Sequence, residues 1–144
     1  MSARYDSKHG LVSRPPFDLY MGFCDLRNMV AMLPEDKKKD VQATYDTLEA
    51  SVQGFKLGVK VIERTPYSKI VLEGDGTPFA FTVEMHFDAA PDGRTDFWVR
   101  VDAELNAMLK MMLGKRLQEG LDQMVDTLVA ASEGRRPDIP DMKF

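Results

Sequence analysis

The sequence predicts an α+β fold, with an antiparallel sheet of about six strands, two short helices after the first strand, and a long C-terminal helix. Three observations carry this prediction. Apolar and polar residues alternate through residues 41–105, turn signals interrupt the alternation at short intervals, and residues 107–132 have helical periodicity. Connections this short cannot hold crossover helices, so the strands must run antiparallel.

Two prolines organise the first elements. Pro15 and Pro16 end a strand because neither can donate to its ladder, and Pro16 suits the first turn of a helix. Asp25 can cap a second helix, which Leu33-Pro34 ends. We therefore expect a strand at 5–13 and helices at 17–24 and 26–32.

The alternating region divides into five candidate strands. Their turn signals are Gln53-Gly54, Thr65-Pro66-Tyr67, Gly74-Asp75-Gly76 and Pro91-Asp92-Gly93. The strands are predicted at residues 41–52, 55–64, 68–73, 78–87 and 95–105.

The last turn fixes a register. Pro91-Asp92-Gly93 fits a three-residue loop, a type I turn in which Gly93 takes the left-handed position. The resulting pairs are Phe87 with Phe97, Met85 with Val99, Val83 with Val101, Phe81 with Ala103, and Glu84 with Arg100. One face of this hairpin is apolar and the other is polar, so one side faces water and the other faces a core or cavity.

The C-terminal helix is predicted over residues 107–132. Its apolar stripe consists of Leu113, Leu117, Leu121, Met124 and Leu128. This stripe needs an apolar sheet to cover, which the two preceding strands supply. Residues 133–144 are expected to form a mobile tail after a single domain whose core spans residues 5–132.

Charge argues against nucleic acid as a partner. The 144-residue chain has a net charge of −4, which gives no attraction to a phosphate backbone. The basic run Lys37-Lys38-Lys39 is flanked by Glu35, Asp36 and Asp40, so we expect a solvated loop there.

Cytoplasmic location is the simplest expectation. Cys24 is the only cysteine, so no disulfide can form within the chain. The first ten residues lack the apolar segment of a secretory signal, and no apolar run reaches the roughly 18 residues that a membrane span requires.

The order of elements resembles the helix-grip fold of the START-like, or SRPBCC, superfamily, over about residues 5–132. VSRPPFDLYMGFCDLRNMVAMLPE at 12–35 resembles its strand end, proline-started helix, aspartate and closing Leu-Pro. The segments VQGFKLGVKVIERTPYSKIVLEG at 52–74 and GRTDFWVRVDAEL at 93–105 continue the resemblance. The superfamily includes polyketide cyclase and dehydratase-like proteins, coenzyme Q-binding proteins and a family of carbon monoxide dehydrogenase-associated proteins.

The resemblance implies a sheet curved around the long helix, with a cavity between them for an apolar molecule such as a lipid, quinone or polyketide. The alternation and the resemblance agree on the inward residues: Leu57, Val59, Val61, Phe79, Phe81, Val83, Met85, Phe97, Val99 and Val101. Met108, Met111 and Met112 begin the long helix, where the resemblance places the cavity entrance. Methionine is flexible and polarizable, so these three residues can form a lid, although core or dimer-surface methionines are the alternative.

Catalytic groups are few. A nucleophilic Cys24 would need a histidine base, and His86 is expected on the polar face beside Trp98. Asp88, Asp92 and Asp96 lie near one hairpin tip, but their spacing does not match a calcium loop, so we expect solvated turn residues. EGDGTPF at 73–79 lacks the pattern of a phosphate-binding loop and is predicted to be a hairpin turn.

Polar groups near the expected cavity remain open from the sequence. Tyr20, Tyr45 and Tyr67 are possible hydrogen-bond donors. In the strand at 41–52, either Thr47, Glu49 and Ser51 or Leu48, Ala50 and Val52 point inward, and the alternation does not decide which.

Three functions remain. The first is binding of an apolar small molecule without catalysis, cofactor or metal, and the second is a cyclase or dehydratase-type enzyme. The third is an interaction protein, such as a homodimer, whose cavity is filled by its aromatic side chains.

Overall fold

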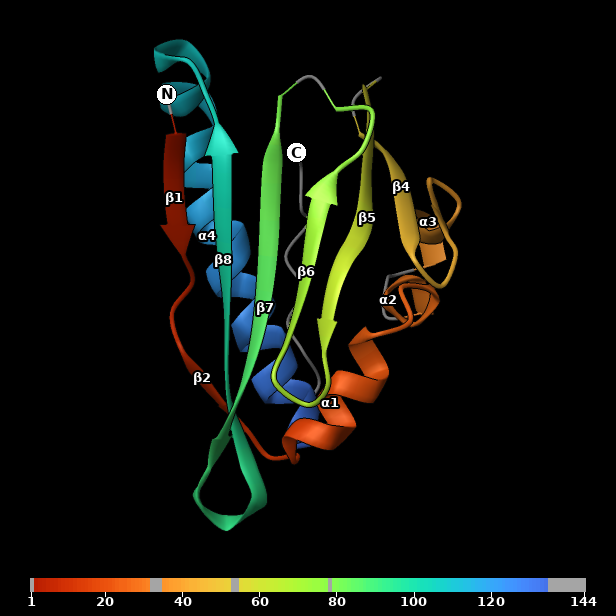
Figure 1. The fold of residues 1–144 in the computed structure, drawn as a ribbon, viewed down its shortest axis with the longest axis vertical. Coiled ribbons are helices and arrows are strands. Elements are labelled where there is room, and N and C mark those ends of the chain that lie inside the picture. The colour runs from red at the N-terminus through yellow and green to blue at the C-terminus, as the bar shows by residue number, and fades with distance from the viewer. Residues whose placement is uncertain (1, 32–34, 53–54, 78, 135–144) are drawn as a thin grey trace.

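The computed structural model describes residues 2–31, 35–52, 55–77 and 79–134, and Figure 1 shows its elements. The strands are β1 (Ser2–Asp6), β2 (Gly10–Val12), β3 (Val41–Ala43), β4 (Thr47–Val52), β5 (Phe55–Thr65), β6 (Lys69–Gly74), β7 (Phe81–Ala90) and β8 (Arg94–Glu104). The helices are α1 (Pro16–Phe23), α2 (Arg27–Ala31), α3 (Glu35–Lys38) and α4 (Ala107–Ser132), with a 3-10 turn at Pro91–Gly93. Residues 32–34 and 135–144, which include the predicted Leu33-Pro34 stop and most of the predicted tail, lie outside the described residues.

These strands belong to one antiparallel sheet in the order β1-β8-β7-β6-β5-β4-β3, and β2 also pairs with β8. The predicted fold class is confirmed: the sheet is curved and antiparallel, two short helices follow the first strands, and the predicted long helix is α4. The expected number of about six strands was too low, because two segments that were predicted as single strands each form two.

The first of these segments breaks at Ser7. The Ser7 side chain accepts a hydrogen bond from the backbone N–H of Val99 at 2.9 Å, and the Ser7 N–H donates to the Val99 carbonyl at 2.8 Å. A side chain thus takes the place of a backbone acceptor, and regular pairing with β8 resumes only at Gly10. The Lys8 N–H donates to the Asp122 carboxylate at 2.7 Å, which ties this break to α4.

The second segment, residues 41–52, was predicted as one strand, and this was wrong. It is a tight hairpin in which Val41 pairs with Ala50 and Ala43 with Leu48. The Thr44 hydroxyl accepts from the Thr47 N–H at 3.1 Å, a local side-chain bond that stabilises the turn. The predicted loop at residues 37–39 is also partly helical, since α3 covers residues 35–38.

The β7–β8 hairpin has the predicted register. All five pairs derived from the turn occur, including Phe87 with Phe97 and Glu84 with Arg100. Gly93 is left-handed as predicted, with φ 69°, but Asp92 is left-handed too, with φ 62°. The loop therefore differs from the predicted type I turn, and Asp tolerates this conformation better than most side chains do.

A β-bulge in β5 changes which residues face inward. The pairing with β6 shifts between Val61 and Glu63, so Val61 pairs with Leu72 while Arg64 pairs with Ile70. Because a one-residue shift turns following side chains to the other face, Arg64 joins the concave side and Ile62 is 49% exposed.

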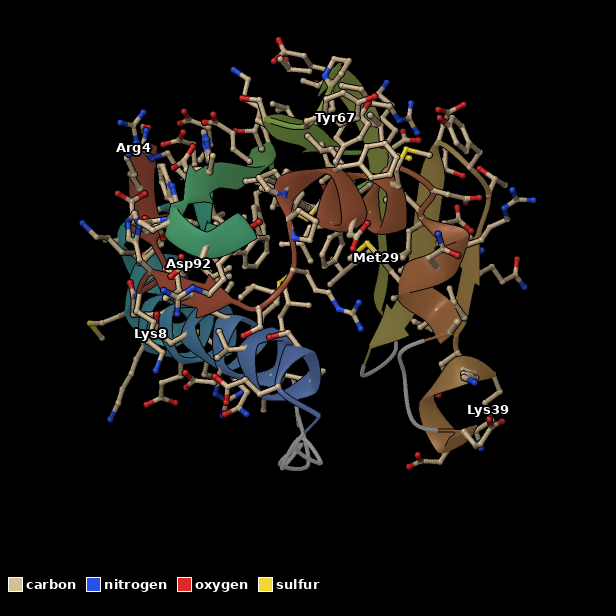
Figure 2. The ribbon with its side chains drawn as sticks, turned by 90° about the horizontal axis from the view of Figure 1, so that it is seen from below. Arg4, Lys8, Met29, Lys39, Tyr67 and Asp92 are labelled. Carbon is tan, nitrogen blue, oxygen red and sulfur yellow. The ribbon has the colours of Figure 1, made fainter. Side chains whose placement is uncertain are left out.

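The helices cover different parts of the concave side (Figure 2). α4 packs on β1, β2 and β8, α1 packs on β6 and β7, and α2 and α3 lie against β3. Asn106 caps α4 by accepting from the Leu109 N–H at 2.8 Å. Within the described residues, the principal helix contacts leave out β4 and β5.

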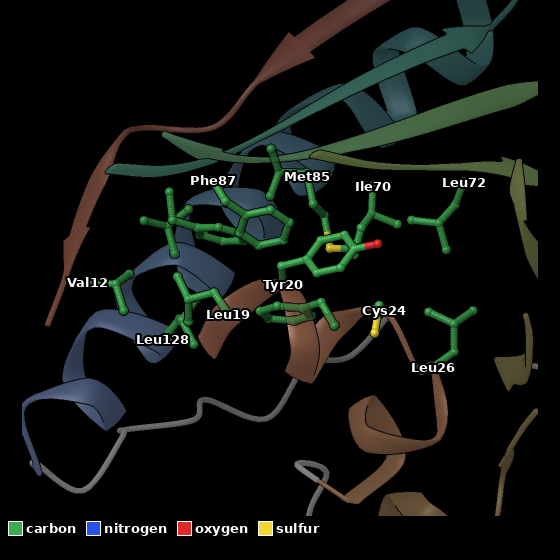
Figure 3. Close-up of a cluster of buried hydrophobic side chains, with 14 residues drawn as sticks. Val12, Leu19, Tyr20, Cys24, Leu26, Ile70, Leu72, Met85, Phe87 and Leu128 are labelled. Carbon is green, nitrogen blue, oxygen red and sulfur yellow. The ribbon is translucent and has the colours of Figure 1, made fainter. Parts of the chain in front are cut away.

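The main core lies where α1 and the end of α4 meet the middle strands, as Figure 3 shows. Phe97 is fully buried and stacks on Phe23 with ring centroids 5.7 Å apart and on Phe87 at 5.6 Å. The cluster consists of Val12, Leu19, Tyr20, Phe23, Cys24, Leu26, Ile70, Leu72, Met85, Phe87, Phe97, Val99, Val125 and Leu128.

Close packing of α4 on β2 gives a first prediction. A Cβ added at Gly10 would lie 2.7 Å from Val129 Cγ2 and closer still to Val125 Cγ1. Both neighbours are β-branched and stiff, so Gly10→Ala is expected to lower the free energy of unfolding by about 1–3 kcal/mol. The matched variant is Gly120→Ala on α4, where nothing lies within 4 Å of the added Cβ. Urea unfolding should show that Gly120→Ala gains up to about 1 kcal/mol, and equal effects of the two variants would contradict this packing.

Candidate functional site

The candidate site is the concave surface of the sheet, where the predicted lining residues fall into two groups. Met85, Phe97, Val99 and Val101 are buried, with at most 5% of their surface exposed, and they belong to the two packed clusters. Leu57, Val59, Val61, Phe79, Phe81 and Val83 are only half-buried. A ligand can touch the second group without displacing core side chains.

The half-buried group continues onto β4 and α4. Leu48 pairs with Val59 and Ala50 pairs with Leu57, so Leu48 and Ala50 point inward while Glu49 and Ser51 are exposed. This settles the orientation that the sequence left open. From α4, Leu121 and Met124 pack against the edge of the core and remain partly exposed.

Tyr20 is a polar group within the core, and Figure 3 shows its hydroxyl directed toward Ile70. Burial raises the pKa of the Tyr20 phenol above its ordinary value. The phenol therefore stays protonated at neutral pH and can act only as a hydrogen-bonding group, not as a base. Tyr67, 50% exposed, packs edge-on against Tyr20 with ring centroids 5.5 Å apart.

Tyr5 is a second concave hydroxyl, and the sequence analysis did not single it out. Tyr5 pairs with Val101 and packs in the smaller cluster with Phe81 and Leu109. Its buried hydroxyl has no hydrogen-bond partner among the described residues and would lie 2.9 Å from a Cβ added at Gly114. Gly114 thus permits close packing of α4 on β1, one of the two roles that the sequence allows for a helical glycine.

Arg64 brings a charge to the concave side. Its Nη2 donates to the carbonyls of Cys24 at 2.7 Å and Tyr45 at 3.0 Å, and its Nη1 donates to Asp46 at 2.8 Å. The guanidinium also lies over the Tyr45 ring, 4.2 Å from the centroid. Sequence alternation missed Arg64 because it placed Glu63 on this face. The adjacent apolar residues Val61-Ile62 were the available signal of a bulge.

The three methionines lie away from the concave surface. Met108, Met111 and Met112 are 67%, 86% and 62% exposed. The expectation that Met111 could face the sheet is not met, because the side of α4 that contacts the strands carries Leu109 and Leu121 instead.

Both histidines lie on the outer face of the sheet. His86 stacks on Trp98 at 4.1 Å, as the register predicts, and His9 stacks on the same ring at 5.1 Å. Cys24 is buried, and its thiol donates to the Met21 carbonyl at 3.3 Å. None of these groups is placed to form a nucleophile and base pair with another.

The hairpin aspartates already have partners. Asp88 accepts from Trp98 Nε1 at 3.0 Å, Asp96 lies 3.0 Å from His9 Nδ1, and Asp92 lies 3.7 Å from Arg94. Their contacts are those of surface turn residues. A shallow hollow of about 270 Å³ also lies on the outer face, lined by Ser2, Glu73, Gly74, Ala80, Phe81, Thr82, Asp102 and Glu104.

An ion pair on the outer face gives a pH prediction. Arg100 donates to the Asp6 carboxylate at 2.7 Å, and this hydrogen bond lowers the pKa of Asp6. Because the folded pKa is below the unfolded one, the stabilisation is present above about pH 4 and is lost as pH falls through the folded value. Urea unfolding from pH 7 to pH 2 should show a shallower acid loss for Asp6→Asn than for the wild-type chain. Identical pH profiles would show that the pair contributes nothing.

Three solved structures have a similar fold. A norcoclaurine synthase from Thalictrum flavum, in complex with dopamine and hydroxybenzaldehyde, matches with a TM-score of 0.73 and 10% identity over 94% of this chain and 89% of its own. A Rhizobium loti protein matches with a TM-score of 0.67 and 12% identity over 92% and 97%. A Thermobifida fusca protein matches with a TM-score of 0.70 and 12% identity over 94% and 96%.

The chain therefore has the START-like helix-grip fold, and the resemblance stated from the sequence is confirmed at the level of the fold. No protein-family model matches the sequence, and a comparison with curated proteins finds no significant match. Among the described residues, no helix has the length and apolar character needed to cross a membrane.

Proposed function

We propose that this protein binds an apolar small molecule on the concave surface, against β4, β5, β7 and α4, without catalysing a reaction. The observation that supports this proposal most is the half-buried apolar surface of β4 and β5, which the helices leave largely uncovered within the described residues. Burying such surface under an apolar ligand is favourable by about 25 cal/mol per Å². A lipid, a quinone or a polyketide-like compound fits this chemistry.

The ligand contacts that we propose come from the half-buried group. Leu57, Val59 and Val61 supply the β5 side, and Phe79, Phe81 and Val83 supply the β7 side. Pockets of this kind are mostly apolar with a few polar groups that fix orientation, and the hydroxyl of Tyr5 is one such group here. The buried residues Met85, Phe97, Val99 and Val101 form the floor beneath.

The test compares two variants of one strand. Val59→Asp places a charge on the concave surface, whereas Ile62→Asp makes the same change at a residue that is 49% exposed across the bulge. Binding of the neutral fluorescent probe N-phenyl-1-naphthylamine is expected to weaken at least tenfold in Val59→Asp and to stay unchanged in Ile62→Asp, because a buried charge without a partner is costly.

Two outcomes would contradict the proposal. One is a wild-type chain that does not bind the probe, and the other is equal binding by both variants. If Val59→Asp does not fold, Val59→Thr replaces it, because a hydroxyl in place of a methyl group keeps the volume. Native mass spectrometry of protein purified from its own host should also show a co-purified apolar compound.

The second candidate is an enzyme of the cyclase or dehydratase type. The Thalictrum flavum synthase carries out chemistry on this fold, and the concave side here offers the Tyr5 and Tyr20 hydroxyls. Mass spectrometry of a bound polyketone probe separates the two functions. A carrier returns the probe unchanged, whereas a cyclising dehydratase returns it lighter by one water molecule.

A homodimer through the exposed methionines is the third candidate, and light scattering on the purified chain tests it. We also propose a cytoplasmic location, which the free thiol of Cys24 supports.

A further inference from the structure

The outer side of α4 carries an apolar surface near its first turns. Met108, Met111 and Met112 are separated by three and four residues, so they share one side of the helix. With exposures of 62–86%, they contribute to neither packed cluster. Three large apolar side chains together in water indicate a surface that something covers, since scattered single residues are the norm.

The charges around this surface have one sign. Residues 105–118, LNAMLKMMLGKRLQ, contain Lys110, Lys115 and Arg116 and no acidic residue, although the whole chain has a net charge of −4. Lys115 lies one turn beyond Met111, and Arg116 lies one turn beyond Met112, so cations adjoin the methionines. The contact between Lys115 and Glu119 is 4.0 Å long and highly exposed, which leaves Lys115 available to another anion.

We propose that this surface of α4, defined by Met108, Met111, Met112, Lys115 and Arg116, docks on an anionic lipid membrane, with the helix axis parallel to the bilayer plane. In this arrangement the methionines enter the boundary between headgroups and acyl chains, while the cations contact lipid phosphates. An apolar stripe bordered by Lys and Arg is typical of helices that lie in the interface. Each cation near an anionic surface strengthens binding, whereas the acidic remainder of the chain is repelled from it.

A membrane fits the side chains better than a protein partner does. Unbranched methionines adapt to a fluid surface that has no fixed shape, whereas protein hot spots favour rigid Trp, Tyr and Arg anchors. The surface lies on the side of α4 that faces away from the strands, so docking does not depend on the concave site. Loss of one activity can therefore be measured without loss of the other.

The experiment is sedimentation of the full chain with vesicles of phosphatidylcholine alone or of phosphatidylcholine mixed with phosphatidylglycerol. Binding is expected only to the mixed vesicles and is expected to weaken at high salt. Lys115→Gln with Arg116→Gln should weaken partitioning roughly fivefold per cation, or about 25-fold together. Met111→Gln with Met112→Gln should reduce it by at least tenfold.

The matched control replaces two other exposed apolar residues, Leu11→Gln with Ile62→Gln, which are 41% and 49% exposed on the sheet. This control should bind the mixed vesicles as the wild-type chain does. The proposal is overturned if the mixed vesicles do not bind the chain, if neutral vesicles bind it equally, or if the methionine variant binds unchanged. It is also overturned if light scattering finds a dimer that the methionine variant converts to monomer, because a second copy then covers the surface.

Discussion

Phe97→Ala is expected to lower the free energy of unfolding by about 3–5 kcal/mol. Phe97 is 0% exposed, and its ring stacks on Phe23 and Phe87, so truncation removes buried apolar surface and leaves a cavity. Domains of this size are typically stable by only about 5–15 kcal/mol, so the variant loses a large part of its stability.

Urea unfolding followed by circular dichroism measures this loss. The control is Met111→Ala, which truncates a side chain that is 86% exposed and should change stability by less than about 0.5 kcal/mol. The same pair of variants tests the sequence-based view of both residues as ligand contacts. A Phe97→Ala chain of normal stability with altered probe binding would show that Phe97 lines a cavity and not the core.

Arg64→Met is expected to destabilise the chain by about 2–4 kcal/mol. The side chain is 20% exposed and joins the end of α1 to the β3–β4 turn through the carbonyls of Cys24 and Tyr45 and the carboxylate of Asp46. Methionine keeps much of the apolar length but removes every donor, so these acceptors lose their partner. The Tyr45 ring also loses its cation.

Arg4→Met is the matched control for this second prediction. Arg4 bonds Asp102 at 2.8 Å, but its side chain is 60% exposed, so water screens the pair and its loss should cost no more than about 1 kcal/mol. Chemical unfolding of both variants measures the difference. Equal effects of the two substitutions would mean that Arg64 does not hold these elements together.

Local patterns predicted the elements whose geometry is set by their own residues. The register of β7 and β8 followed from a three-residue turn between two alternating strands, because turn length fixes which residues face each other. The bounds of α4 followed from its helical periodicity and the Asn106 cap. The first strand and the segment at 41–52 were less accurate, since Ser7 and Thr44 use side-chain hydrogen bonds that alternation does not encode.

The sequence by itself therefore determined the fold class, the long helix and the apolar face of the last hairpin, because periodicity and turn chemistry act over a few neighbouring residues. Only the tertiary structure decided how that face is used. Helix placement buries Phe97 and Val99 while it leaves Val59 half-exposed, and the β5 bulge turns Arg64 inward. It also leaves Met111 facing water. These outcomes depend on which distant elements pack together, and the period of one strand or helix does not contain that information.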